Sequence, residues 1–356
     1  MTDRSPLSPS RRGLLAAAGA AVVAAPHVAR AEKTVIKWRC ATAWTKNLIG
    51  PGVSAKRLTE RIKTLSQGAL EIEIFGAGEI VPALQTFDAV SSATVEMAHT
   101  ASLFWGGKIP VAPVFTTVPF GPGPTTHMAW LQTGGQTLWD ELYAPYKLKP
   151  FVGGNTGPSA AGWFRREIKS LDDIKGLRIR ATGLGGELYG RLGATAIALP
   201  PADTYPAFER GVVDAVELLA PANDAPLGFN RIAPFYMFPG FNKPNGASEV
   251  LIGQKAWDSL NADLKTIVAQ ACEMEHAVAV TEAYALNMEA LTALAQGGTK
   301  IVLMPQDVLG AGYKAADEIL DRVQATSPMA ERIVASLRAF TAKSRTWHQV
   351  SQGLTP

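Results

Sequence analysis

The sequence predicts an α/β fold of two lobes, with a long connecting helix and a C-terminal helix. Apolar runs with strand spacing alternate with runs of helical spacing along the first half of the chain. The chain has 356 residues, which is more than one compact core usually takes. No Pro or Gly interrupts the stretch between Gln254 and Gly297. A helix of that length typically ties two lobes together or forms an oligomer contact.

The first 31 residues have the features of an export signal. Ser10-Arg11-Arg12 precedes an apolar run from Leu14 to Ala25, and Ala29-Arg30-Ala31 offers a cleavage site of small residues. The apolar run is shorter than the ~20 residues that span a bilayer. The segment carries four Arg and one Asp, so the formal charge of +3 leaves with it and no nucleic-acid partner is indicated. We therefore predict a twin-arginine signal over 1–31 and a near-neutral periplasmic protein.

The next segment predicts a sheet. Strand spacing and helical spacing alternate along the chain, with strands at 36–40, 70–74 and 95–99 and helices at 51–68 and 84–91. Strands that alternate with helices predict a parallel sheet with right-handed crossovers. Residues 106–124, which are rich in Gly and Pro, are expected to be irregular and to cross between lobes or line a cleft.

A second α/β unit follows over 157–245. Its strands end at Arg180 and at Glu217, and a strand at 250–252 and a helix from Trp257 to Ala295 come after it. We expect the chain to divide into lobe I (32–156 and 246–325), lobe II (157–245) and a C-terminal helix (326–356).

The C-terminal helix has a start signal and an apolar stripe. Ser327-Pro328 supplies an N-cap and a first-turn proline. One face carries the apolar side chains Ile333, Leu337, Phe340 and Trp347. The stripe either packs on its own domain or docks on a second subunit.

Arg180 and Glu217 form the candidate site. In open α/β sheets ligands bind beyond the carboxyl ends of the strands, where both residues are expected. A helix begins at Gly183, so Arg180 lies beside free backbone N–H groups that favour an anion. The alternative for Arg180 is a structural salt bridge, for example to Glu187, and the alternative for Glu217 is an ion pair without ligand contact. The residues thus favour capture of a small carboxylate.

Other site classes find little support. The sequence has no HExxH, GxSxG or CxxC, and its histidines show no metal-ligand spacing. Cys40 and Cys272 are expected to be buried rather than bonded. Apolar walls are expected from the aromatic side chains Phe104, Trp105, Tyr236 and Phe241.

The chain resembles the solute-binding proteins of TRAP transporters, the DctP type. The likeness rests on "GNTG" at 154–157, "GWFRREIKSLDDIKGLRIR" at 162–180, "YPAFERGVVDAVE" at 205–217 and a later "GFN". It covers essentially the whole mature chain, with "KAWDSL" at 255–260 in register. The resemblance implies a two-lobed, type II-like periplasmic binding protein fold and, most closely, the branch that binds 2-oxo acids and related monocarboxylates. It assigns carboxylate binding to Arg180.

In that branch a sodium or calcium ion often lies beside the substrate, and this chain departs from the pattern. The resemblance places Ser159 where an amide is usual, keeps Glu217, and replaces the following aromatic by Leu218. In the turn 240–244, Lys243 stands where an acid is usual. Glu217 and the Leu218 backbone could still hold a metal. Our hypothesis is that Lys243 takes its place, paired with Glu217 and the ligand. Leu218 enlarges the pocket, so the ligand is expected to be bulkier than pyruvate.

We therefore expect a periplasmic subunit, not an enzyme, that delivers an organic monocarboxylate to TRAP membrane subunits. The acid is expected to be a 2-oxo, 2-hydroxy, aryl or branched one, and no cofactor is expected. The predicted site residues are Arg180, Ser159, Glu217, Leu218, Lys243, Phe104, Trp105 and Phe241. Members of that branch can be dimers through a swapped C-terminal helix. The competing hypothesis is an exported enzyme, since twin-arginine export often carries cofactor-loaded enzymes.

Overall fold

The structure is a computed structural model that describes residues 1–2 and 35–351. Apart from its first two residues, the predicted export signal lies outside the described residues. No helix of the described part is both long and apolar enough to cross a membrane.

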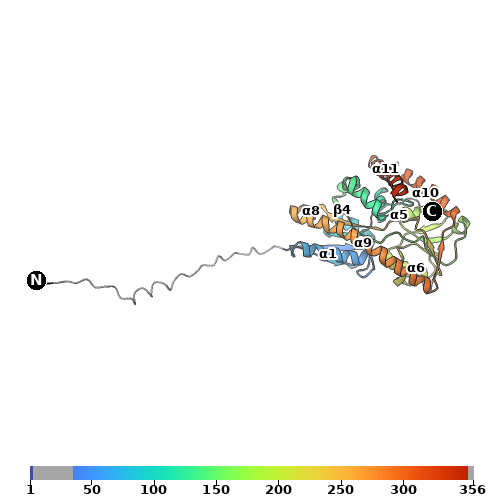
Figure 1. Cartoon of the computed structure of the whole chain (residues 1–356), viewed down its shortest axis with the longest axis horizontal. Coiled ribbons are helices and arrows are strands. Elements are labelled where there is room, and N and C mark those ends of the chain that lie inside the picture. Colours follow the sequence, from blue (N-terminus) through green and yellow to red (C-terminus); the bar gives the residue numbers. More distant parts are fainter. Residues whose placement is uncertain (3–34, 352–356) are drawn as a thin grey trace. The chain divides into compact units, whose positions relative to one another are not determined.

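Two β-sheets organise the described chain (Figure 1). The first has the order β2-β1-β3-β10-β4. Its strands are β1 (Ile36–Thr42), β2 (Leu70–Phe75), β3 (Met97–Thr100), β4 (Leu148–Asn155) and β10 (Ala247–Gly253). The second has the order β11-β9-β5-β8-β6-β7. Its strands are β5 (Gly162–Phe164), β6 (Arg178–Arg180), β7 (Thr195–Ile197), β8 (Ala215–Val216), β9 (Phe235–Phe238) and β11 (Lys300–Leu303).

The first sheet is mixed, whereas the sequence predicted a parallel one. β1 pairs in parallel with β2 and β3, but β10 is antiparallel to both β3 and β4. The reason is the route of the chain. β4 leaves for the second sheet at Asn155, and β10 returns at Ala247, which pairs with Asn155. A strand that re-enters where its neighbour left must run in the opposite direction.

The lobe boundaries also need one correction. β11 pairs in parallel with β9, so residues 246–325, which were expected in lobe I, contribute a strand to each sheet. The cause is the length of the helix before β11, which carries the chain from the first sheet to the second.

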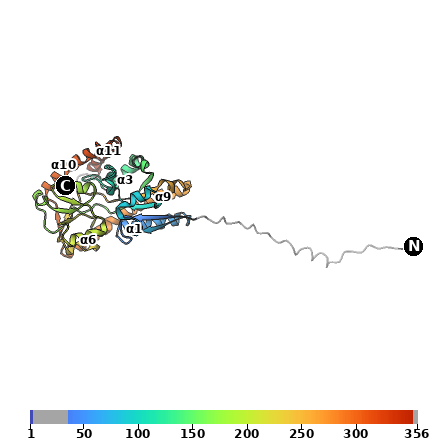
Figure 2. The same cartoon turned by 180° about the vertical axis from the view of Figure 1, so that it is seen from behind.

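The helices cover both sheets. They are α1 (Pro51–Leu65), α2 (Thr86–Ser91), α3 (Pro124–Trp130), α4 (Gln136–Tyr143), α5 (Gly183–Arg191), α6 (Pro201–Glu209), α7 (Pro221–Asp224), α8 (Gln254–Asp258), α9 (Ala262–Gln296), α10 (Gln306–Gln324) and α11 (Pro328–Ser351). Short 3₁₀ turns include η2 (Ser102–Trp105) and η3 (Ala112–Phe115). Figures 1 and 2 show α10 and α11 side by side at one end of the molecule.

The long helix α9 begins at Ala262 and not at Trp257 as predicted. Asn261 caps it, because its side chain accepts a hydrogen bond from the Leu264 N–H at 2.8 Å. A separate short helix, α8, ends at Asp258. The absence of Pro and Gly concealed the break, since a capping Asn is an equally good start signal.

Other sequence signals are confirmed. Ser327 Oγ accepts from the Ala330 N–H at the start of α11. Cys40 and Cys272 are free and fully buried in one core cluster between the first sheet and the helices α1 and α9. Burial raises the pKa of both thiols, that of Cys40 to about 12.

Candidate functional site

Chain segments from both sheets meet at one pocket. β6 ends at Arg180 and pairs in parallel with β8, whose last residue, Val216, faces Arg180 in the register. The predicted strand end at Glu217 is therefore one residue beyond the observed one. Lys243 lies in the turn between β9 and β10, and the loop after β1 supplies the opposite wall through Trp44.

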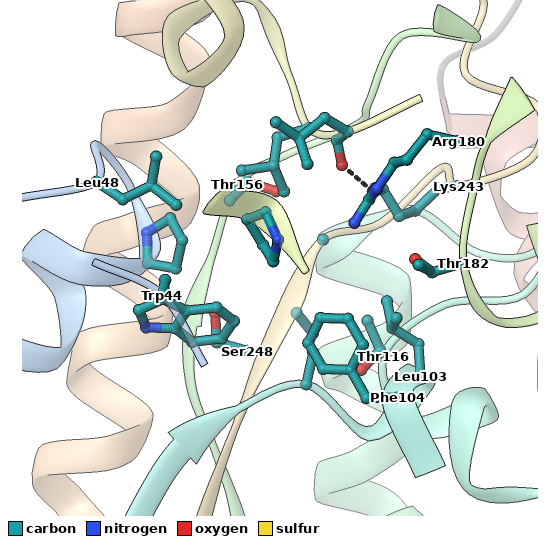
Figure 3. A pocket seen from close by; sticks show the side chains of 17 residues that line it. Trp44, Leu48, Leu103, Phe104, Thr116, Thr156, Arg180, Thr182, Lys243 and Ser248 are labelled. Atoms are coloured by element: carbon teal, nitrogen blue, oxygen red, sulfur yellow. Dashed lines mark hydrogen bonds between the residues drawn. The ribbon is translucent and has the colours of Figure 1, made fainter. Parts of the chain in front are cut away.

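The pocket is a small space of about 50 Å³ between residues of both sheets. Figure 3 shows Arg180 and Lys243 on one side and Trp44 and Leu48 on the other. Apolar groups make up most of the lining: Trp44, Leu48, Pro51, Ala101, Leu103, Phe104, Pro201, Leu218, Leu219 and Ala247. Hydroxyl groups come from Thr116, Thr156, Thr182 and Ser248.

Arg180 is a buried cation with unused donors. Its side chain is 2 % exposed. Nε and Nη2 donate to the Leu199 carbonyl at 3.1 and 2.7 Å, and Nη1 donates to the Glu217 carbonyl at 2.7 Å. A guanidinium has five N–H donors, so these bonds to described residues leave one N–H on each terminal nitrogen. Those two N–H groups can bind a carboxylate in bidentate fashion.

The electrostatics of Arg180 favour an anion. Burial lowers the pKa of Arg180 from its ordinary value, and the charges of Glu217 and Asp224 oppose this shift. Even so, an arginine stays protonated in proteins. The predicted alternative, a salt bridge with Glu187, is not formed, because Glu187 pairs with Arg322 at 2.5 Å. The hydrogen bonds of this buried cation to described residues go only to backbone carbonyls, which do not neutralise its charge, so the charge remains available to a negatively charged ligand.

Lys243 is the second cation in the pocket. It is 6 % exposed, and its Nζ lies 2.5 Å from Glu217 Oε1. The ammonium also donates a hydrogen bond to the Leu218 carbonyl (Figure 3). Glu217 is buried and does not line the pocket, whereas Lys243 does. The contact with Oε1 lies outside hydrogen-bond geometry and is an ion pair.

The predicted site residues fall into two groups. Arg180, Leu218, Lys243 and Phe104 line the pocket. Ser159, Glu217, Trp105 and Phe241 do not. Their roles in binding stay predictions, since the geometry alone assigns no ligand.

Each residue outside the lining has a structural reason. Trp105 Nε1 donates to Glu249 in the core at 2.7 Å. Phe241 packs between the rings of Phe120 and Tyr189. The Ser159 N–H donates to the Lys243 carbonyl, which turns this residue toward the loop 240–244. Aromatic and polar residue types alone do not distinguish wall from core.

Sequence reasoning missed most of the wall from the first sheet. Trp44 and Leu48 follow the carboxyl end of β1, where the strand-end rule could have found them. Thr116 lies in the stretch 106–124, which was expected to line a cleft, but no single residue was assigned there. Thr156 lies in the "GNTG" motif. Pro201 and Leu219 carried no distinguishing signal.

A hydrogen bond joins the loop after β1 to α7. Asn223 Nδ2, on α7, donates to the Ile49 carbonyl at 2.7 Å. The adjacent Gly50 has φ +80°, and a Cβ there would lie 2.5 Å from Asn223 Nδ2. Glycine is therefore required both by the backbone conformation and by the close approach. These contacts join the loop after β1 to α7.

Asp224, the last residue of α7, is a buried carboxylic acid that does not line the pocket. Its carboxylate accepts hydrogen bonds from Trp163 Nε1 at 3.1 Å and from the Tyr236 hydroxyl at 3.0 Å. Burial raises the pKa of Asp224 to about 7, although these hydrogen bonds favour the ionised form. Tyr236, predicted as a wall residue, is fully buried in a hydrophobic core cluster instead.

Comparison with known proteins gives a consistent result. The family described as bacterial extracellular solute-binding protein, family 7 (DctP), matches residues 46–327. A monocarboxylate 2-oxoacid-binding periplasmic protein of Nostoc sp. is 36 % identical over 318 residues, which cover 89 % of this chain and 87 % of that protein.

Solved structures match over a similar length. A TRAP transporter solute-binding protein from Bordetella bronchiseptica, a dimer with copurified calcium and picolinate, has a TM-score of 0.87 at 34 % identity, covering 89 % of this chain and 95 % of its own. A TRAP periplasmic solute-binding protein from Pseudoalteromonas atlantica with bound sodium and pyruvate has a TM-score of 0.86 at 36 % identity. It covers 89 % of this chain and 98 % of its own. The two-lobed, type II-like fold is thus shared.

Proposed function

This chain belongs to the DctP family and is the solute-binding protein of a TRAP transporter, and we propose that it captures an organic monocarboxylate in the pocket around Arg180. The observation that carries the proposal is the buried guanidinium with one N–H unused on each terminal nitrogen among the described residues. The acid is a 2-oxo, 2-hydroxy or bulkier aryl or branched one, because the rest of the lining is mostly apolar. Relatives that bind pyruvate and picolinate support this class.

The proposed cycle has an open and a closed state. Binding shifts an open–closed equilibrium of the lobes, and the closed form is what the membrane subunits recognise. The family acts outside the cytoplasm. We propose export by the twin-arginine pathway on the basis of the 1–31 segment, and no catalytic turnover.

The residues do not fit a calcium or sodium ion beside the ligand. No group of three or more His, Cys, Asp or Glu side chains suited to a metal occurs among the described residues. The Glu217 carboxylate already faces the Lys243 ammonium at 2.5 Å. A cation there would meet a like charge. We therefore propose that binding needs no metal ion, although relatives bind their acids with calcium or sodium.

We also propose a homodimer through α11. Ile333 and Leu337 are buried within the chain, whereas Trp347 is 66 % and Val350 is 73 % exposed near the end of this helix. Only the first half of the predicted apolar stripe on α11 therefore packs on the rest of the chain. A second copy is the proposed occupant of the exposed half, as the dimeric Bordetella relative suggests.

Substitution of Arg180 tests the proposed function. Two charge-assisted hydrogen bonds contribute roughly 3–6 kcal/mol, so Arg180→Ala should weaken pyruvate or 2-oxopentanoate binding by about 100-fold or more in titration calorimetry. Arg180→Lys keeps the charge without the paired donors and should bind with intermediate affinity.

The matched control is Arg178→Ala. Arg178 lies two positions earlier on β6, exposed, and pairs with Asp214. It should leave affinity unchanged. Thermal unfolding of each ligand-free variant reports the fold. Native affinity in a folded Arg180→Ala protein would refute the assignment, and turnover of any acid would favour an exported enzyme.

A further inference from the structure

One arginine and one lysine side chain line the same pocket, and both are buried. Arg180 and Lys243 both line it, at 2 % and 6 % exposure. They are linked through one residue, since Arg180 Nη1 donates to the Glu217 carbonyl and Lys243 Nζ faces the Glu217 carboxylate at 2.5 Å. Both positive charges therefore lie at the same end of the pocket, as Figure 3 shows.

The fixed charges at this end do not cancel. Arg180 and Lys243 carry two positive charges, and Glu217 supplies one negative charge in contact with Lys243. The buried Asp224 also acts on both cations, but burial raises its pKa to about 7, so at neutral pH it supplies less than one full negative charge. No acidic side chain is part of the described pocket lining. An uncompensated charge in a buried site is costly, so a ligand with one negative charge completes the balance when the lobes close.

The ammonium has a donor to spare. Lys243 Nζ carries three N–H bonds. One is donated to the Leu218 carbonyl and one side faces Glu217 Oε1. With respect to the described residues, the third remains for the pocket. A carboxylate bound to the free N–H groups of Arg180 would present its oxygens, or an adjacent oxo or hydroxyl oxygen, to that donor.

The other end of the pocket has no charge. The wall opposite Arg180 includes the side chains Trp44 and Leu48. A second carboxylate on the ligand would lose its water there without gaining a cationic partner. The pocket therefore discriminates by ligand charge as well as by size.

We propose that Lys243 is the resident cation of this site, which binds the ligand together with Arg180 and restricts the pocket to ligands with a single negative charge. The inference rests on the proposed carboxylate-binding function. In this site the covalently attached ammonium of Lys243 takes the place of the ion that accompanies the acid in relatives.

The first test compares two acids of equal length. Titration calorimetry on protein stripped of ligand by refolding would use 2-oxopentanoate, with one carboxylate, and 2-oxoglutarate, with two. We expect 2-oxopentanoate to bind at least about 100-fold more tightly, since each 1.4 kcal/mol is tenfold. A chelator should change its affinity less than about twofold. Preference for 2-oxoglutarate, or loss of binding with chelator, would overturn the proposal.

The second test removes the ammonium. Lys243→Met should weaken 2-oxopentanoate binding by at least about 100-fold, because the lost ligand contact is charge-assisted and Glu217 is left unpaired. The double variant Lys243→Met with Glu217→Gln removes the stranded charge and keeps the protein foldable. It should still bind at least about 10-fold more weakly than the native protein. The control is Lys175→Met, an exposed lysine paired with Asp172 on the surface.

The two proposals fail in different ways. If the native protein binds no carboxylate, or if Arg180→Ala binds as the native protein does, the proposed function is wrong. If Arg180→Ala loses binding while the folded double variant keeps native affinity, the pocket binds carboxylates and only the role of Lys243 is wrong.

Discussion

At the scale of single residues, the fold also buries carboxyl groups that do not line the pocket. Glu249 on β10 is fully buried and accepts a hydrogen bond from Trp105 Nε1 at 2.7 Å. Burial raises the pKa of Glu249 to about 8, against the opposing effect of its hydrogen bonds. The folded protein thus holds a proton that the unfolded chain releases above about pH 4.3. Stability from this group is complete below that pH and is lost as the pH rises toward 8.

We predict that Glu249→Gln reverses this loss. Glutamine keeps an acceptor for Trp105 and does not ionise. Each pH unit between the two pKa values is worth about 1.4 kcal/mol, or a few °C in Tm. The Tm of the variant minus that of the native protein should therefore rise between pH 5 and pH 8, as measured by calorimetry.

A matched variant, Glu60→Gln, reports the effect of removing one surface carboxylate on α1. If the Tm difference for Glu249→Gln is independent of pH, Glu249 ionises normally in the fold and the reasoning is wrong.

At the scale of elements, α9 ties the two halves of the site together. It packs on β4 and α1 at one end and on α7 at the other. Asn287 donates to the Thr156 carbonyl and accepts from the Ala222 N–H, so one side chain joins the crossover to α7. Closer to its start, Glu275 is fully buried and pairs with Arg57 and Arg61 of α1 at 2.7 Å each.

We predict that Glu275→Ala lowers stability by about 3 kcal/mol or more, since it leaves two arginines without their buried partner. That corresponds to a fall of roughly 6–12 °C in Tm. The matched control is Glu282→Ala, about two turns further along the same face of α9 and 38 % exposed, which pairs with Arg57 alone. Partly exposed pairs contribute about 1 kcal/mol or less. Equal effects of the two substitutions would contradict this account.

At the scale of the whole molecule, the chain crosses between the sheets three times, and the pocket lies beside the first two crossings. β4 leads to β5, β9 returns to β10, and α9 leads to β11. Thr156, Lys243, Gly246 and Ala247, near the first two crossings, line the pocket. Closure on a ligand at this position couples binding directly to the relative placement of the lobes.

The proposed dimer belongs to this scale. We predict that the native protein has the mass of a dimer by size exclusion with light scattering, and that Trp347→Glu is monomeric because it places a charge in the shared apolar face. Leu303→Glu is the control, since Leu303 is 75 % exposed on a different element, β11. A monomeric native protein at micromolar concentration, or dissociation by both substitutions, would exclude this interface.

The sequence by itself determined the local structure and the charged end of the site. Strand and helix periods, the cap at Ser327 and the position of Arg180 at a strand end depend on residues that are close together in the chain, so their patterns are readable without the fold. The start of α9 was missed because the prediction relied on the absence of Pro and Gly, although a capping residue such as Asn261 is an equally good start signal. The antiparallel β10 and the transfer of β11 to the second sheet depend on the route of the chain and have no local signature.

Tertiary structure alone decided which side chains form the pocket. Trp44 and Leu48 meet Arg180 and Lys243 across about 130 to 200 residues of chain. Trp105 and Phe241 are aromatic, as wall residues often are. In the structure, however, Trp105 donates a hydrogen bond to the buried Glu249 and Phe241 packs on Phe120, so both lie in the core. Periodicity shows that a side chain is buried, but burial in a wall and burial in a core give the same pattern. Only the packing of distant segments separates them, because that packing sets where space is left for a ligand.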